Sequence, residues 1–326
     1  MTNVEPINSF EKIGDAAKRV VARIGAATVW DGNKIDKPGL YSAVPIDRYH
    51  GDLTVGPGIS SSGLRTIEAK TPLHYYANSY LNPDRVEQPA NDAFDFGRAA
   101  HTLLLGDTGF RDEFAIRPAE FKDFRTKAAQ EWRDTARAAG KTVLTADDLA
   151  AIKAIAANLD AHPLARDLLR GQIEQSLVFK DAATGVWVKS RPDVLPADGI
   201  VADLKTTTDA SPDAVRKSIL NFGYAMQAAV VGKAMKSVLG IDMTAFALVF
   251  VEKTSPYAVS VVEVDLDWIA YASRQVRRAL DIFAKCIETN EWPGYEGEPI
   301  VYMPDWLRKR LDDESDVGLL PREYAA

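Results

Sequence analysis

Apolar residues recur with the spacing of α-helices through much of the first half of the chain. In ISSSGLRTIEAKTPLHYYANSYL, residues 59–81, serines precede a Leu64, Ile67 spacing, which predicts an N-capped helix, and Thr71-Pro72 begins a second one. Further helices are predicted over residues 91–107, 122–140 and 144–169. The N-terminal half is therefore expected to be mostly helical.

From residue 173 the pattern changes to the alternation that is typical of strands. Strands are predicted over residues 173–181, 186–195 and 199–207, with a hairpin over 244–265 around the turn TSPY, and helices over 211–235 and 265–288. Residues 1–55 lack a sustained period and are expected to form an arm ahead of one domain, residues 56–326. The predicted fold class is α/β, with a central mixed β-sheet flanked by helices on both faces.

Composition narrows the classes of protein that fit. The 326 residues are 46% hydrophobic, which allows a core large enough to hide a few paired charges. Cys286 is the only cysteine, which excludes an internal disulfide framework and metal sites built from several cysteines. The sequence shows neither a signal peptide nor a membrane-spanning run, so we expect a cytoplasmic protein. A net charge of −7 argues against a coat for nucleic acid but not against a nuclease, which needs only a local basic surface.

The stretch RPDVLPADGIVADLKTT, residues 191–207, places charges among residues that favour buried strands. Period-two alternation puts Asp203 and Lys205 on one side of a strand, and the PADG turn would bring Asp193 beside Asp203. Two close carboxylates repel each other unless a cation lies between them. The pattern predicts a hard divalent metal with Lys205 directed at a water or a phosphate oxygen, although Asp-x-Lys alone is more often an inert surface ion pair.

Other candidates come from the neighbouring segments. Tyr224 and Gln227 lie three residues apart, on one face of a predicted helix, and either bind a phosphate or a base edge or simply fill a helix–sheet interface. His101 lies in an apolar helix, where a lone histidine is more often a core residue than a ligand. Glu174 opens the first strand and is either a further ligand or a strand-end charge.

In order along the chain, RPD, DLKTT and YAMQ closely resemble the motifs of the PD-(D/E)XK nuclease superfamily, in its exonuclease VIII (RecE-type) branch of phages and prophages. The resemblance covers roughly residues 38–298, since DRYHGD, ISSSGL, GRAAHTLLL, AHPLARDLL and NEWPGY also fit that branch. It implies a PD-(D/E)XK nuclease-like core. We expect a nuclease core with a short arm, without the large N-terminal extension of the longest relatives.

The resemblance assigns roles to single positions. Asp193, Asp203 and His101 resemble metal ligands, and the Leu204 backbone carbonyl is a further candidate. Lys205 resembles the motif lysine. Glu174 matches a family glutamate, and Tyr224 and Gln227 match the helix motif that follows the lysine. Mg²⁺ or Mn²⁺ suits ligands that are mainly oxygen with one imidazole.

The implied function is a metal-dependent exodeoxyribonuclease that degrades one strand of linear double-stranded DNA. Polarity from the 5′ end, a ring-shaped homo-oligomer around DNA, and a RecT-like single-strand annealing partner follow from the resemblance alone. The alternatives are an endonuclease, a single-strand or flap nuclease on the same fold, and a non-catalytic DNA-binding protein. A glycoside hydrolase with Asp193 and Asp203 as acid and base fits poorly, because Lys205 is adjacent and aromatic sugar platforms are missing.

Overall fold

The computed structural model describes residues 26–86, 92–104, 113–195, 199–297, 300 and 302–316. The chain divides into two compact units, Met1–Trp292 and Pro293–Ala326. The second unit contains helix α13 (Asp305–Asp316). None of the helices in the described ranges has the length and hydropathy needed to cross a membrane.

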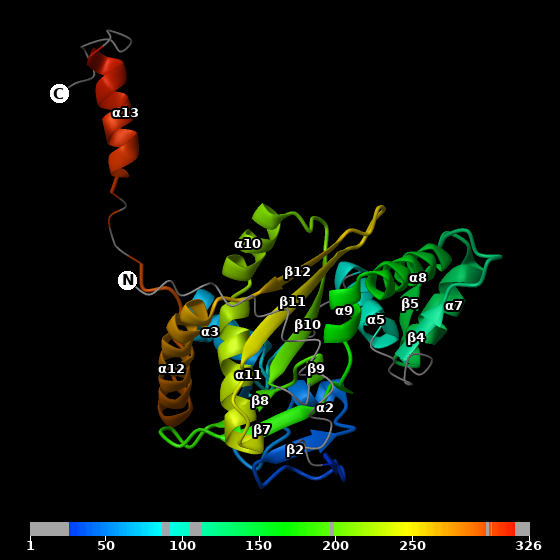
Figure 1. Ribbon diagram of the computed structural model, residues 1–326, viewed down its shortest axis with the longest axis horizontal. Helices are drawn as coiled ribbons and strands as arrows, with labels where there is room; N and C mark the ends of the chain where they lie inside the picture. Colours follow the sequence, from blue (N-terminus) through cyan, green and yellow to red (C-terminus); the bar gives the residue numbers. More distant parts are fainter. Residues whose placement is uncertain are drawn as a thin grey trace, which may run out of the picture. The chain divides into compact units, whose positions relative to one another are not determined.

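The first unit contains two five-stranded sheets, a two-stranded sheet and the helices packed against them (Figure 1). One five-stranded sheet has the order β1 (Thr28–Val29), β2 (Gly39–Ser42), β7 (Ser176–Lys180), β8 (Trp187–Ser190), β3 (Gly58–Ser60). The other has the order β12 (Val259–Glu263), β11 (Ala245–Glu252), β10 (Ile200–Thr207), β9 (Val194–Leu195), β6 (Gln172–Ile173). Strand β4 (Phe114–Ile116) pairs with β5 (Thr142–Leu144). Both large sheets are mixed. Strand β10 pairs with β11 in parallel and β11 pairs with β12 antiparallel, while in the other sheet β3 pairs with β8 in parallel and β7 pairs with β8 antiparallel.

The helices follow the predicted pattern closely. They are α2 (Ile46–His50), α3 (Ser61–Ala69), α4 (Pro72–Asn78), α5 (Asp92–Leu104), α7 (Lys127–Ala138), α8 (Ala146–Ala161), α9 (Pro163–Leu168), α10 (Pro212–Asn221), α11 (Tyr224–Leu239) and α12 (Leu266–Thr289). Ser60 and Thr71 cap α3 and α4 as predicted, each through its side-chain oxygen. Both predicted ends of the helix expected over residues 91–107 lie outside the described residues.

Strand β10 has helices on both faces. Val201 packs in a core with Phe246 of β11 and Met226 of α11, whereas Ala202 and Leu204 pack on the opposite face with residues of α8 and α9. All of these side chains are buried, and each large one contributes about 1.5–3 kcal/mol to the free energy of unfolding. Asp203 lies on the α11 face, because it alternates with Leu204. The predicted α/β class with a central mixed sheet is confirmed.

Three predicted elements are divided in the structure. The helix expected over 144–169 breaks at His162, which ends α8 and caps α9 through its side chain, since Pro163 has no N–H to continue the ladder. The helix expected over 211–235 breaks at Gly223, which adopts φ 63°. The strand expected over 186–195 is interrupted at residues 191–193, so β8 and β9 belong to different sheets.

Part of the predicted arm contributes to the sheet. Residues 39–41 of β2 pair antiparallel with residues 176–178 of β7. The predicted hairpin at 244–265 is confirmed, because β11 and β12 pair antiparallel on either side of residues 253–258. The domain boundary at residue 55 stays a prediction.

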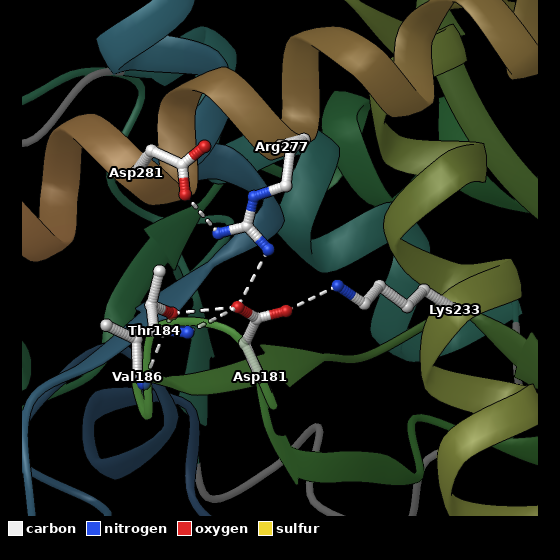
Figure 2. Close-up of polar contacts among 6 residues, drawn as sticks. All are labelled: Asp181, Thr184, Val186, Lys233, Arg277 and Asp281. Atoms are coloured by element: carbon white, nitrogen blue, oxygen red, sulfur yellow. Dashed lines mark hydrogen bonds and ion pairs between the residues drawn. The ribbon is translucent and has the colours of Figure 1, made fainter.

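A buried carboxylate ties α11 and α12 to the turn between β7 and β8 (Figure 2). Asp181 is 2% exposed and accepts hydrogen bonds from Lys233 Nζ at 2.5 Å and from Arg277 Nη1 at 2.8 Å. Thr184 donates from its backbone N–H and its hydroxyl to the same side chain. Arg277 also contacts Asp281 at 2.7 Å. The network holds α11, which carries two of the predicted site residues, in a fixed place on the sheet.

Candidate active site

Asp193 and Asp203 lie opposite each other on neighbouring strands. Val194 of β9 pairs with Ala202 of β10, so the next pair in this antiparallel register is Asp193 and Asp203. The Asp193 carboxylate also accepts the Leu204 N–H at 2.7 Å through Oδ2. The apposition that the PADG turn predicted is therefore present in the structure.

Lys205 and Gln227 hold the Asp203 carboxylate from two sides. Lys205 Nζ donates to Oδ1, and the Gln227 side-chain amide donates to Oδ2. Asp203 is 1% exposed, so these two donors replace the water that the carboxylate loses on burial. The Oε1 atom of Gln227 is itself buried and makes no hydrogen bond with the described protein groups.

His101 reaches the same site from α5. Its Nδ1 atom lies 3.3 Å from Asp193 Oδ2, although about ninety residues separate the two in sequence. Both side chains are largely shielded from solvent. The structure thus brings the histidine that the resemblance singled out into contact with one of the two strand carboxylates.

The close packing of these charges shifts their pKa values in opposite directions. Burial disfavours ionisation of Asp193, but the neighbouring His101 and Lys205 outweigh it and lower the pKa to about 2. Burial and the charge of Asp193 raise the pKa of Asp203 to about 6 in spite of Lys205. Burial alone would lower the pKa of His101 and of Lys205, but the two carboxylates raise both. The cluster thus pairs two acidic side chains with two basic ones, whose charges offset one another.

Tyr224 packs against the cationic side of the cluster. Its ring lies 4.9 Å from Lys205 Nζ and 5.9 Å from the guanidinium carbon of Arg65. Arg65 is half-buried and donates to the Phe222 carbonyl at 2.7 Å. Burial raises the pKa of the Tyr224 hydroxyl, which therefore stays protonated at neutral pH.

A cavity of about 550 Å³ opens onto these groups. Six of the seven predicted side chains of the site line it: His101, Glu174, Asp193, Lys205, Tyr224 and Gln227. The seventh, Asp203, accepts hydrogen bonds from two of them, Lys205 and Gln227. Four basic residues also line it: Arg65, Arg98, Arg191 and Lys253. Arg191 is already engaged, because it donates to Ser176 Oγ and to the Val44 carbonyl.

Several groups of this cavity were not predicted from the sequence. Ser61 and Ser190 line it with buried hydroxyl oxygens that find no hydrogen-bond partner among the described residues. Glu113, between α5 and β4, also lines it. Ser61 stands in the motif ISSSGL, where helix capping explained the serines, and Ser190 directly precedes the stretch that begins at Arg191. Glu113 lies beyond any local pattern that marks a site.

The residues fit a divalent cation in chemistry, although the arrangement shown is not a complete metal shell. Within the described ranges, no three His, Cys, Asp or Glu side chains are grouped closely enough to hold an ion. Both carboxylate oxygens of Asp203 already accept hydrogen bonds, one from Lys205 and one from Gln227. Two apposed carboxylates, one of them with a raised pKa, together with an imidazole and an unpartnered amide oxygen, are nonetheless the donor types that Mg²⁺ or Mn²⁺ binds. The Leu204 carbonyl stays a predicted further ligand.

A solved structure shares this fold. The chain aligns with a Eubacterium rectale protein named "Putative exonuclease" at a TM-score of 0.53 and 13% identity, over 81% of this chain and 94% of that one. A second structure, of SSO0001, gives a TM-score of 0.26 at 12% identity over 65% of this chain and 84% of that one, which is too low to support an argument. No curated protein matches the chain in sequence.

Residues 60–302 match a family described as a PDDEXK-like domain of unknown function (DUF3799). The match includes every residue of the site described above. It supports the PD-(D/E)XK superfamily, while the exonuclease VIII branch stays a prediction. Because the matched residues make up well over half of the 326, the chain belongs to the DUF3799 family of PDDEXK-like domains.

Proposed function

We propose that this protein is a metal-dependent exodeoxyribonuclease that hydrolyses phosphodiester bonds in one strand of linear double-stranded DNA. The observation that carries the proposal is the convergence of Asp193, Asp203, Lys205 and His101, from two strands and a distant helix, on one cavity. The match to a PDDEXK-like domain supports nuclease activity, and the structural neighbour named as an exonuclease is consistent with that class of enzyme.

The chain's own groups would position the phosphate and the attacking water. Lys205 is charged at neutral pH and lies at the cavity wall, where its ammonium would orient a water molecule or bind a phosphate oxygen. Tyr224 and Gln227 limit its movement, because the ring packs against Nζ and the amide holds the carboxylate to which Nζ donates. Arg65 adds a second, half-buried cation on the same wall.

Asp193, Asp203 and His101 would hold the cation. When bound, Mg²⁺ or Mn²⁺ supplies Lewis-acid stabilisation of the charge that develops on the phosphate and on the leaving oxygen. The Leu204 N–H fixes Asp193 on its strand, so this carboxylate is positioned before any substrate arrives. His101 keeps its neighbour ionised over the working pH range, because it lowers the pKa of Asp193.

The finer features of the proposal come from the RecE resemblance. They are polarity from the 5′ end, single-stranded tails made for recombination, a homo-oligomeric ring around DNA, a RecT-like annealing partner, and a phage or prophage origin. Each is separable from the chemistry of the site. A single-strand or flap nuclease would use the same residues on a different DNA structure.

The test compares the wild-type chain with Asp203→Ala on linear duplex DNA in Mg²⁺, with Asp213→Ala as a matched control. Asp213 is exposed, and its one ion pair within the described ranges is with Arg216, three residues away on the same helix, so its removal should leave nucleotide release unchanged. Asp203→Ala should abolish release. Undiminished release by Asp203→Ala would refute the proposed function.

Substrate form separates the candidate activities. An end-dependent enzyme should leave circular DNA intact and should digest the same DNA after linearisation. Labels placed separately at the 5′ and 3′ ends should show early release of the 5′ label. Cleavage of the circle would instead identify an endonuclease.

A further inference from the structure

Two large apolar side chains stand exposed where α10 meets α11. Leu220 is 68% exposed and Phe222 is 59% exposed. A phenylalanine left in water forgoes the stabilisation that burial would give it, so such a ring often marks a binding surface. The fold offers no reason for it, since Ile219 and Val215 of the same helix are buried in the core.

The backbone that presents Phe222 is fixed from several directions. Its N–H bonds to the Ser218 carbonyl, and its own carbonyl accepts from Arg65 Nη1 at 2.7 Å. The next residue, Gly223, adopts φ 63°, and a Cβ there would lie 3.2 Å from Arg65 Cδ. The turn therefore has one well-defined path, and the exposed ring is held on a rigid support, which lowers the entropy lost when a ligand binds.

The ring is also the outer member of a row that leads to the candidate active site. Its centroid lies 5.7 Å from that of Tyr224, with the planes tilted by 31°. The Tyr224 ring in turn lies 4.9 Å from Lys205 Nζ, which donates to Asp203. A cavity of about 430 Å³ beside Phe222 shares Ser62 and Arg65 with the cavity that holds the carboxylates.

These positions match what a nucleic-acid strand needs on either side of a cleaved phosphate. The sugar–phosphate backbone is anionic and suits the cavity with Arg65 and Lys205, while the base has an apolar face that stacks on aromatic rings. The second cavity provides such a surface, with Ile219, Met226 and Trp268 in its wall behind Phe222. A polar edge remains for the base, because Asn221 and Gln275 line the same cavity.

We propose that Phe222 is a stacking platform for the nucleobase that flanks the scissile phosphate. The inference rests on the proposed function and names its substrate more closely. A base inside a duplex is already covered on both faces, so it reaches this ring only when it is unpaired or unstacked. The site therefore engages the attacked strand with at least one base withdrawn from the helix, and duplex ends that fray easily are the better substrates.

The test measures binding separately from cleavage. The Asp203→Asn chain, which lacks the carboxylate, is titrated into a single-stranded oligonucleotide with 2-aminopurine at each terminal position in turn. Phe222→Ala in this background should weaken binding about 5- to 150-fold, the value of one base–aromatic stack. Phe222→Ala should also abolish the fluorescence quenching that stacking on Phe222 causes at one of the 2-aminopurine positions. Phe222→Trp should restore both. Val55→Ala should change neither, because Val55 is an apolar side chain of similar exposure, 57%, that lines neither cavity.

Cleavage by the otherwise wild-type chain gives an independent readout. Phe222→Ala should raise KM most for ends with an unpaired terminal base and should erase the preference for such ends over fully paired ones. Unchanged affinity, quenching and KM in Phe222→Ala, with DNA still cleaved, would refute the stacking role alone. Dissociation of an oligomer by Phe222→Ala in sedimentation would assign the ring to a contact between chains and also refute it. A parent chain that neither binds nor cleaves DNA would instead refute the proposed function.

Discussion

Replacement of Asp181 by asparagine tests how much the buried network in Figure 2 contributes to stability. Asparagine has the same shape and keeps an oxygen for the two Thr184 donors. Its NH₂ group cannot accept a hydrogen bond from Lys233 or Arg277. The substitution therefore removes two charge-assisted hydrogen bonds and leaves the packing of the turn in place.

The expected cost follows from the exposure of the partners. Breaking a fully buried ion pair costs about 3–5 kcal/mol, because the remaining charge loses its partner away from water. Here the Lys233 and Arg277 side chains are 40% and 34% exposed, and Arg277 keeps its contact with Asp281. Water can therefore solvate both cations in part. We expect Asp181→Asn to lower the free energy of unfolding by about 2–3 kcal/mol, which corresponds to a fall in Tm of about 3–5 °C for a chain of this length.

The loss should also depend on pH. Burial opposes ionisation of Asp181, but hydrogen bonds from Lys233, Arg277 and Thr184 outweigh it and hold its pKa well below the usual range. A group with a depressed folded pKa stabilises the native state above its unfolded pKa, about 3.9, and loses this effect as the pH falls. The difference between wild type and Asp181→Asn should be constant from about pH 5 to 8 and shrink below about pH 4.

Urea unfolding followed by far-UV circular dichroism measures both effects. Asp242→Asn is the matched control, because Asp242 pairs with Lys236 at 2.7 Å but both side chains are more than half exposed. This exposed pair should contribute less than about 1 kcal/mol. If Asp181→Asn shifted the urea midpoint no more than Asp242→Asn does, burial would not be the reason for the strength of the network.

Four further changes test the site itself. Lys205→Ala should lower the rate of nucleotide release at least about 100-fold on linear duplex DNA, as loss of a charge-stabilising donor does elsewhere, with far-UV circular dichroism unchanged. Without divalent metal, Asp203→Asn should be more stable than wild type at pH 7 and equal to it near pH 4 in urea unfolding, because the raised pKa of about 6 means that the ionised carboxylate destabilises the fold. Asp193→Ala should be less stable than Asp193→Asn by about 1–3 kcal/mol in the same assay, since only asparagine keeps an acceptor for the Leu204 N–H. Gly223→Ala should cost about 1–2 kcal/mol in thermal unfolding, because its φ of 63° suits glycine. Three results would contradict the roles given to these groups. They are equal stabilities of Asp203→Asn and wild type at pH 7, equal stabilities of Asp193→Ala and Asp193→Asn, and full activity of Lys205→Ala.

The local geometry of the carboxylates could be predicted from sequence. A short turn between two strands fixes their register, and alternation fixes their faces, so Asp193, Asp203 and Lys205 followed from spacing alone. The contact of His101 with Asp193 could not follow in this way, because it depends on how α5 packs against β10. Only the family resemblance pointed to it.

The divided elements show where local patterns lose information. A glycine inside a helix costs only about 1 kcal/mol, so Gly223 gave no clear sign of a break, and the contact with Arg65 that requires the turn comes from a helix far away in sequence. Pro163 did mark the end of a helix, but the apolar spacing continued across it. In the strand over 186–195, Pro192 removes one N–H from the ladder, and this is where the two sheets separate.

The candidate site occupies the edge of β10 that this separation exposes. Strand β10 pairs with β11 along its whole length but with β9 only at Ala202, so its next N–H groups on that side need other acceptors. The Leu204 N–H finds the Asp193 carboxylate instead of a carbonyl. The Asp193 side chain thus hydrogen-bonds to the strand that carries Asp203. The distance between the two acids is therefore set by the strand register rather than by flexible side chains. The same arrangement forces two like charges together, which raises the pKa of Asp203, and Lys205 and His101 offset part of that repulsion. A cation that binds both acids must therefore compete with Lys205 and Gln227 for Asp203, so the affinity for metal and the position of the lysine are coupled at this edge.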